Sequence, residues 1–356
     1  MRFGHALELK NECFAQNYNV PTQDVGLRVN SLPAEAARGS QFSIGFSRRG
    51  SDNYHLEVRT DRESGRSYDL AQEFKKRAPD EIHIGVVENL VVPAPEALAQ
   101  AARETQASSW YRDRMRPLHL GLSVGNLNGG VGTIGGFVED AQGQPAIISN
   151  CHVLASLRPR DELDRRVYQP GRQDVPLESL LGSHAIATLG DHTTFSASGA
   201  NYLDAAYAIL DRDYLDQLLH PNGNVVPDRC PHAGTRIREV ANYEKLGPNQ
   251  KVAKVGRTTG WTVGTVGAFG VDDRIINIPY HGNRRFDDLL EIQWDSPDAP
   301  FTAPGDSGSL IFMLDRFAAV GLHFASGVLR IDGNRVHVSY ACSLARVLQI
   351  FNLTWM

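Results

Sequence analysis

The loop Ala303–Leu310, with the sequence APGDSGSL, places the strongest constraint on this chain. Its centre, Gly305-Asp306-Ser307-Gly308-Ser309, sets a small hydroxyl residue between glycines, and an apolar run follows as a predicted strand. Glycine adopts backbone angles that side chains forbid, so such a loop can aim consecutive N–H groups at one point. Acyl transfer needs this arrangement, with a serine oxygen as nucleophile and N–H donors facing the developing oxyanion. Taken alone, the same pattern also fits a simple turn.

Two other stretches carry side chains that would activate such a serine. Ile148–Ala155 (ISNCHVLA) places His152 at the end of an apolar, β-branched run, and in Asn201–Leu210 (NYLDAAYAIL) Asp204 interrupts an apolar strand. The histidine, the aspartate and Ser307 follow one another in an order in which Ser-His-Asp triads occur. Each residue also has a purely structural explanation, as a core histidine, a buried carboxylate or a turn serine. Their combination in this order favours the triad.

In these motifs the chain resembles the trypsin/chymotrypsin-like serine peptidases. SNCHVLA is similar to the histidine motif of that family, LDAAYAIL to its aspartate motif and PGDSGSL to its serine motif. GRTTGWTVGTV, at residues 256–266, resembles the hairpin that opens the second barrel in bacterial members. The resemblance covers residues 118–351. It implies a mainly β fold, a chymotrypsin-like double six-stranded β-barrel, preceded here by a small α/β domain and a connector helix.

The resemblance also implies a role for each residue of the candidate site. Ser307 attacks a carbonyl carbon, His152 takes and returns the proton, and Asp204 holds the imidazole in one tautomer. The N–H groups of Gly305 and Ser307 form the oxyanion hole. In trypsin itself the residue matching Asp306 pairs with a newly cut amino terminus. No activation sequence precedes the barrel here, so we expect a backbone N–H or an arginine as the partner of Asp306.

Specificity depends on Thr302, shortly before the serine, and on His323, in the strand that follows. In the resembled family these positions line the pocket for the side chain that precedes the cut, and bacterial glutamyl peptidases carry Thr and His at similar places. Phe301 stands where trypsins keep an acidic pocket base, which argues against Arg or Lys. A hydroxyl and a protonatable imidazole predict cleavage after Glu or Asp. The alternative is that His323 only packs within its strand.

The chain of 356 residues is longer than one typical domain, and its sequence pattern divides it into three parts. Residues 1–93 combine short strands with a helical pattern and predict a small α/β domain, whose expected role is support or oligomerisation. Residues 94–117 predict a connector helix, because Glu96–Met115 contains no Gly or Pro. Residues 118–356 predict the peptidase domain, two β-barrels closed by an amphipathic C-terminal helix.

Composition excludes several classes of function. A formal net charge of −5 argues against bulk nucleic-acid binding, and no apolar run is long enough to span a membrane. The four scattered cysteines do not form a disulfide pattern and the first residues lack an apolar signal core, so we expect a cytoplasmic protein with free thiols. No spacing indicates a metal site, and no cofactor is expected. The expected partner is a protein or peptide substrate, and the N-terminal domain is a candidate surface for a homo-oligomer.

The whole layout is also similar to plant narrow-leaf-type proteins and their bacterial relatives. That similarity rests on an N-terminal α/β domain, a helix ending near RMRPLHLG, and a barrel with NCHVLA and GDSGSL. It implies an intracellular serine endopeptidase with a regulatory role, and bacterial trypsin-like domains also serve as effectors of anti-phage defence. Two alternatives stay open. One is a catalytically silent barrel that binds proteins, and the other is an esterase, although esterases usually carry GxSxG between a strand and a helix.

Overall fold

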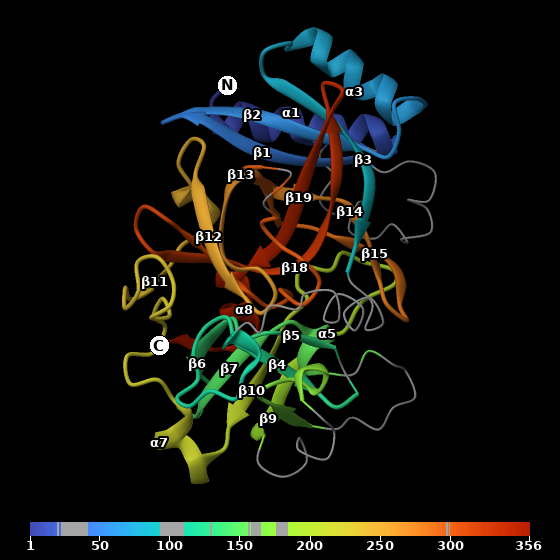
Figure 1. Cartoon of the computed structure of the whole chain (residues 1–356). Helices are drawn as coiled ribbons and strands as arrows, with labels where there is room; N and C mark the ends of the chain where they lie inside the picture. The colour runs from blue at the N-terminus through green and yellow to red at the C-terminus, as the bar shows by residue number, and fades with distance from the viewer. Residues whose placement is uncertain are drawn as a thin grey trace.

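The computed structural model describes residues 1–19, 21–22, 42–92, 110–128, 130–155, 157, 165–175, 184–296, 298 and 300–356. The fold is mainly β, with two curled sheets stacked one above the other and two helices at the N-terminal end (Figure 1). The strands of the lower sheet are β4 (Ser123–Asn126), β5 (Val131–Thr133), β6 (Gly136–Glu139), β7 (Pro145–Ser149), β8 (Arg166–Tyr168), β9 (Ala185–His192), β10 (Ala206–Leu210) and β20 (Thr354–Trp355).

The lower sheet closes into a barrel. Its strands follow the order β6-β7-β10-β9-β8-β4-β5, and only Ile134 and Gly135 separate β5 from β6 along the chain. The path therefore returns to its start, with six strands when β5 and β6 are taken as one. β20 pairs with the outer edge of β6. The pattern of residues 156–200 predicts an irregular connection, but their described part contains β8 and β9, because these strands complete the ring between β4 and β10.

The upper sheet contains a second closed ring. Its strands are neighbours in the order β12-β17-β18-β19-β16-β13, and β13 pairs back with β12. The predicted fold class, mainly β with a double six-stranded barrel, is thus confirmed. The strands of this ring and its attachments are β11 (Glu239–Val240), β12 (Lys251–Gly256), β13 (Gly260–Asp272), β14 (Arg274–Ile278), β15 (Gly282–Phe286), β16 (Leu289–Trp294), β17 (Leu310–Met313), β18 (Ala318–Ile331) and β19 (Asn334–Ser343).

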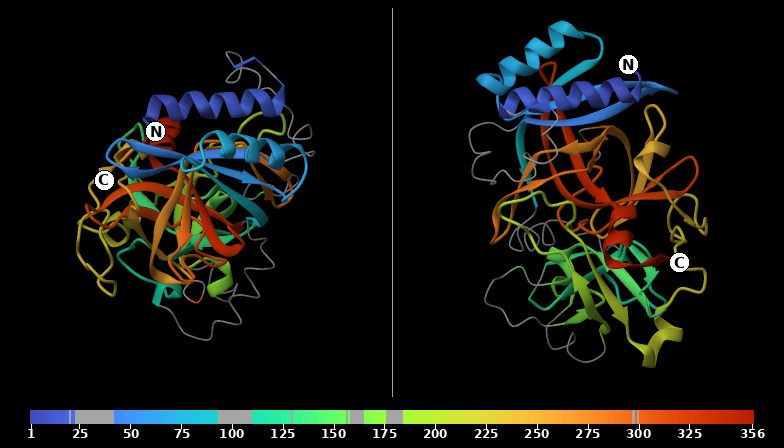
Figure 2. Two further views of the ribbon diagram at one scale, coloured as in Figure 1. Left: turned by 90° about the horizontal axis from the view of Figure 1, so that it is seen from above. Right: turned by 180° about the vertical axis from the view of Figure 1, so that it is seen from behind.

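The N-terminal strands extend the second barrel instead of forming a sheet of their own. β1 pairs with β13, where Ile44 lies opposite Asp272, and β3 pairs with both β18 and β14. α1 and α3 pack on β1, β2 and β3 from outside (Figure 2). The boundary at residue 93 stays a prediction, as does the boundary at 117. The N-terminal elements are α1 (Phe3–Tyr18), β1 (Phe42–Gly50), β2 (Asn53–Thr60), α3 (Arg66–Arg77) and β3 (Ile82–Val91).

The predicted connector helix lies largely outside the described residues. Its described end is a single turn, η3 (Trp110–Arg112), after which residues 113–117 are not helical. Pro117 lies beyond this end and disfavours helical backbone at Arg116, the residue before it. The other short helices are α5 (Cys151–Leu154), η4 (Arg172–Asp174), η5 (Arg212–Tyr214), α7 (Leu215–Leu218) and η6 (Tyr243–Lys245).

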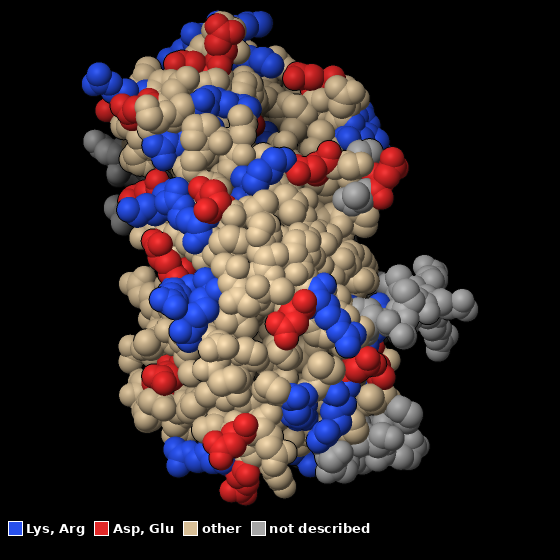
Figure 3. Space-filling model, turned by 60° about the vertical axis from the view of Figure 1, so that its left-hand side comes forward, with Lys and Arg blue, Asp and Glu red and all other residues tan. Residues whose placement is uncertain are grey.

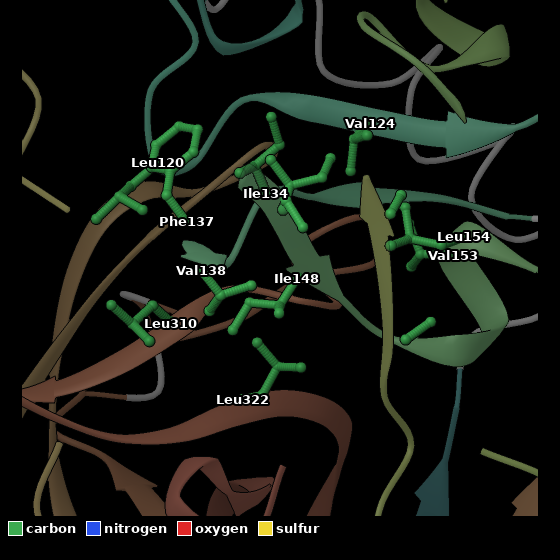
Figure 4. Close-up of a cluster of buried hydrophobic side chains, with 14 of the residues drawn as sticks. Leu120, Val124, Ile134, Phe137, Val138, Ile148, Val153, Leu154, Leu310 and Leu322 are labelled. Carbon is green, nitrogen blue, oxygen red and sulfur yellow. The ribbon is translucent and has the colours of Figure 1, made fainter. Parts of the chain in front are cut away.

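One apolar core joins the two barrels. Phe137 and Ile148 of the first barrel lie in the same buried cluster as Leu310 and Leu322 of the second (Figure 4). The predicted C-terminal helix is α8 (Leu344–Phe351), and its buried Val347 belongs to this cluster. The barrels are therefore held in one arrangement by burial of apolar surface, which is what a site built from both of them requires.

Charged side chains of both signs are interspersed on the face shown in Figure 3, around a broad uncharged middle. That face therefore presents no extended field of one sign, such as a surface that attracts nucleic acid would carry. Within the described residues, none of the helices has the length and apolar character that a membrane-spanning helix requires.

Candidate active site

The histidine and the aspartate predicted for the triad lie in direct contact. β7 and β10 run antiparallel with Ser149 opposite Ala206, so the chain leaving β7 meets the chain entering β10. His152 lies in the turn α5 just after β7, and Asp204 lies just before β10. His152 Nδ1 is 2.5 Å from Asp204 Oδ2, and the His152 N–H donates to Oδ1 at 3.2 Å. Asn150 Nδ2 donates to the Asp204 carbonyl at 2.6 Å and holds the aspartate from another side.

This pair is buried, with Asp204 at 0% and His152 at 5% exposure. Because Nδ1 faces a carboxylate, it carries the N–H, and Nε2 is left as the basic nitrogen. Nε2 has no hydrogen-bond partner among the residues that the structure describes. One ring nitrogen is thus held by a carboxylate while the other is free to take a proton, as a general base requires.

Ser307 is held against the strand that also holds the turn of His152. The N–H of Gly130, just before β5, donates to the His152 carbonyl at 3.0 Å, and the N–H of Thr133, the last residue of β5, donates to the Ser307 carbonyl at 2.8 Å. Gly308 has φ +89°, and a Cβ there would collide with the end of β7. Only glycine permits both this backbone angle and this approach. The loop that carries Ser307 (residues 303–309, the serine loop) therefore lies directly against the ends of β5 and β7.

Two backbone N–H groups of the loop face no acceptor among the described residues. The Pro304 carbonyl accepts from Thr258 Oγ1 at 2.8 Å, so the Gly305 N–H, on the opposite side of that planar peptide, points away from Thr258. The Asp306 carbonyl accepts from the backbone N–H three residues later at 2.9 Å, which turns the Ser307 N–H outward in the same way. Neither N–H donates a hydrogen bond within the described part of the chain. The predicted oxyanion donors are thus unpaired and held in place by their neighbours.

Asp306 lies beneath the loop in a buried ion pair with Lys254. One carboxylate oxygen accepts from the N–H groups of Thr258 at 2.8 Å and Thr259 at 3.1 Å, and the other accepts from Ala303 N–H at 2.9 Å and Lys254 Nζ at 3.2 Å. Although burial opposes the charge, the Lys254 ammonium and these hydrogen bonds hold the pKa of Asp306 below its ordinary value. Backbone donors are present as expected. They satisfy the expectation of a backbone N–H or an arginine, and the buried cation that pairs with Asp306 is Lys254.

The two predicted pocket residues both contact β19. Thr302 Oγ1 lies 2.8 Å from Ser326 Oγ and 2.6 Å from Ser339 Oγ. His323 Nδ1 lies 3.2 Å from the carbonyl of Tyr340, the residue next to Ser339. No hydrogen bond joins Thr302 to His323 in the residues described by the structure, so the connection between them runs through neighbouring positions of β19.

The environment of His323 keeps its imidazole neutral. Burial lowers the pKa of His323 to about 4; the carboxylate of Asp306 opposes this shift and the ammonium of Lys254 adds to it. Since the Tyr340 carbonyl can only accept, Nδ1 carries the N–H and Nε2 is an acceptor. Near neutral pH this wall of the candidate pocket therefore offers hydroxyl groups and a neutral imidazole, with no cation.

Three residues of this region lie outside the sequence-based prediction: Lys254, Ser326 and Ser339. Lys254 occurs in a strand, KVAKVG, where a lysine normally points to solvent, and serines in strands carry no recognisable spacing. Only the fold brings them to the loop. Within the described residues, no cluster of three or more His, Cys, Asp or Glu side chains could hold a metal ion.

No family model and no curated protein matches the sequence. Among solved structures, the chain is similar to the Nocardiopsis protease at 19% identity, over 67% of this chain and 97% of that chain, with a TM-score of 0.42. It is similar to a glutamic-acid-specific serine protease that uses a histidine triad in substrate binding, at 16% identity, 67% and 100% coverage and a TM-score of 0.44.

A third similar structure is Thermobifida fusca protease A, at 15% identity, 67% and 97% coverage and a TM-score of 0.41. These neighbours are chymotrypsin-like serine proteases. At these low scores the fold assignment rests on the strand order of the two rings. The branch of narrow-leaf-type proteins stays a prediction.

Proposed function

We propose that this protein is a serine endopeptidase that cleaves protein or peptide substrates through an acyl-enzyme on Ser307. The observation that carries the proposal is the buried His152–Asp204 hydrogen bond, beside a loop whose Gly305 and Ser307 N–H groups have no acceptor in the described part of the chain. A base, its orienting carboxylate, a nucleophile and oxyanion donors are the four parts that acyl transfer needs.

In the first step, Ser307 Oγ bonds to the substrate carbonyl carbon while His152 Nε2 takes the hydroxyl proton. The carbonyl oxygen becomes negatively charged, and the two N–H groups of the loop stabilise it. The C–N bond then breaks, His152 gives its proton to the leaving amine, and an ester remains on Ser307. Water attacks this ester with His152 again as base, which releases the acid product and restores the hydroxyl.

We further propose a preference for Glu or Asp before the cut. The hydroxyls of Thr302, Ser326 and Ser339 lie together and can donate to a carboxylate. His323 can add a hydrogen bond only after Nε2 takes a proton, because its pKa of about 4 leaves it neutral at pH 7. The preference for Glu over Gln should therefore grow as the pH falls from 7 to 5. A peptide library cleaved mainly after Arg, Lys or bulky apolar residues would reject this preference.

An intracellular location fits the four cysteines, which are all free and buried. A regulatory or anti-phage role, and a homo-oligomer formed through the N-terminal segment, remain proposals that rest on the resemblance in sequence layout.

Fluorophosphonate labelling combined with a proteome-wide cleavage assay tests the proposed reaction. Only an activated serine reacts with the probe, so the wild type should label and Ser307→Ala should neither label nor cleave. Ser51→Ala, at an exposed turn, is the matched control and should behave as the wild type. A wild type that does not label would favour the silent binding module. Labelling with hydrolysis of esters but not of peptides would favour the esterase.

A further inference from the structure

One edge of β18 is shared by three segments of the chain. β19 pairs along the opposite edge from Gly321 to Ile331, so every other partner of that stretch must use the same remaining edge. β17 takes its first part, up to Leu322. The serine loop pairs with the next residue, His323. The His323 carbonyl accepts from Gly308 N–H at 2.8 Å, and the His323 N–H donates to the Ser309 carbonyl at 3.0 Å.

β3 takes the far part of this edge. It runs antiparallel to β18, with Gly85 opposite Ile331 and Val91 opposite Ser326. Between His323 and Ser326, only Phe324 and Ala325 have no pairing partner on this edge within the described part of the chain. Figure 1 shows β3 descending along β18 from the N-terminal layer toward the lower barrel. Its final residue thus stands at the far end of a two-residue gap that begins beside the serine loop.

The end of β3 is held from both sides. Val91 pairs with β18 on one side and with Asn277 of β14 on the other, and Val92 donates its N–H to the Asn277 carbonyl at 3.5 Å. Val92 is itself buried. A strand end paired on two sides cannot move aside without breaking backbone hydrogen bonds in both ladders.

An unpaired strand edge next to the nucleophile is a site at which an extended peptide can add as a further strand. In the proposed function, the side chain before the cut lies by His323, Thr302 and Ser326. The residues that precede the cut must then run along the gap, away from Gly308 and toward Val91. Ser326 lies three residue steps after His323, which at about 3.3 Å per step is about 10 Å of edge.

We propose that β3 is a stop for the substrate strand: only about two residues before the cleaved bond can pair with β18, because the pairing position of the third is occupied by Val91. The proposal rests on the proposed function and defines its substrate more narrowly. Longer substrates must leave the sheet at the third residue before the cleaved bond. The enzyme therefore binds only a short segment before the cut along β18. Unfolded termini and exposed loops can present such a segment, whereas a long strand that stays paired cannot.

A series of peptides of increasing length tests the stop. Each peptide carries the same chromogenic amide and the best residue from the peptide library before it, with one, two, three or four residues in total. We expect kcat/KM to rise from one residue to two and then to change by less than about threefold. On a free edge each added residue would gain hydrogen bonds worth about tenfold. A tenfold rise at the third residue and again at the fourth would overturn the stop.

A variant of the strand end provides the second measurement. Val91→Pro removes a ladder donor, since proline has no N–H, and should release the end of β3 so that the third residue now raises kcat/KM several-fold. Val91→Thr keeps the donor and a similar side-chain volume, and should keep the wild-type length profile. An unchanged profile in folded Val91→Pro, with hydrogen exchange showing that the strand end has been released, would contradict the role of β3.

Failure of this inference can be told apart from failure of the proposed function. If Ser307 labels with fluorophosphonate and the one- and two-residue peptides are cleaved, a rising length profile removes the stop and leaves the endopeptidase in place. If Ser307 does not label and no peptide is cleaved, the proposed function falls and this inference falls with it.

Discussion

Single hydrogen bonds of His152 decide how the candidate base works. Its ring is held by one carboxylate, at 2.5 Å, and the remaining nitrogen has no hydrogen-bond partner among the described residues. The tautomer that can accept the serine proton therefore depends on Asp204 alone among the described side chains. An amide in place of that carboxylate would present either a weaker acceptor or an N–H to Nδ1.

Asp204→Asn should lower kcat by about 10⁴-fold, because the imidazole is then held in the wrong tautomer. Steady-state kinetics on a peptide amide measures the loss, and thermal unfolding checks that the variant is folded. Asp191→Asn, an exposed acid on β9, is the control and should stay within about twofold of the wild type. A loss below tenfold for Asp204→Asn would show that His152 is oriented by other groups.

Stability at acid pH should report the environment of His323. Its pKa is about 4 when folded and about 6.5 when unfolded, so the unfolded chain takes up the proton first as the pH falls. Because the folded-state pKa is depressed, the contribution of His323 to the free energy of unfolding has its full value above pH 6.5 and falls progressively as the pH is lowered toward 4. The shift corresponds to about 3 kcal/mol.

Urea unfolding between pH 7 and pH 4 measures this loss. The free energy of unfolding of the wild type should fall by about 3 kcal/mol more than that of His323→Gln over this range. His5→Gln, at an exposed position of α1, should give a curve parallel to the wild type. Parallel curves for His323→Gln and the wild type would mean that His323 titrates normally in the folded protein.

At the scale of the elements, a buried ion pair joins β2 to β16. The Arg59 guanidinium on β2 lies 3.2 Å and 2.8 Å from the two carboxylate oxygens of Glu291 on β16, and 3.2 Å from Glu57. Tyr340 OH donates to the same Glu291 carboxylate at 2.6 Å. Arg59 is fully buried, so the N-terminal segment supplies the cation that a carboxylate inside the second barrel requires.

Arg59→Met should lower the free energy of unfolding by about 3–5 kcal/mol, because it leaves buried carboxylates without their cation. Chemical denaturation measures the loss. Adding Glu291→Met to Arg59→Met removes one of the unpaired buried carboxylates and should recover part of the lost free energy of unfolding. Arg316→Met removes one partner of an exposed pair with Asp315 and should cost less than about 1 kcal/mol. A similar small cost for Arg59→Met would mean that water reaches the Arg59 site.

On the scale of the whole molecule, the N-terminal strands and the second barrel share one sheet and one core. The buried cluster that contains Phe42 and Val58 of β1 and β2 also contains Ile292 and Met313 of the second barrel. Elements joined by backbone ladders and by a common core open together, since opening one exposes the other.

Hydrogen exchange followed by mass spectrometry should therefore find β1–β3 and β16–β19 protected to the same free energy of opening. The exposed turn at Ser51 between β1 and β2 is an internal reference that should exchange much faster. If the N-terminal strands open at a cost about 2 kcal/mol lower than that of β16–β19, they form a separate folding unit, as the sequence-based division at residue 93 implies.

The candidate site was accessible from local sequence because its chemistry restricts residue types at strand ends. His152 follows β7, Asp204 precedes β10, and Ser307 lies between glycines whose positive φ excludes other residues. Several individual strands were predicted from short-range patterns of strands and turns, whereas the two closed rings were predicted only from the resemblance to a known family. α1 is absent from the sequence-based prediction, although its buried positions recur at helical spacing.

Long-range pairing decided the rest. Lys254 lies on β12 and Asp306 lies in the loop before β17, and these strands pair only in the folded barrel. Nothing near Lys254 in the sequence indicates that it is buried. The same holds for β3, whose partners on β18 lie more than two hundred residues further along the chain. Backbone hydrogen bonds can join any two strands of suitable geometry. Which strands pair is therefore determined by tertiary packing and not by the local sequence pattern.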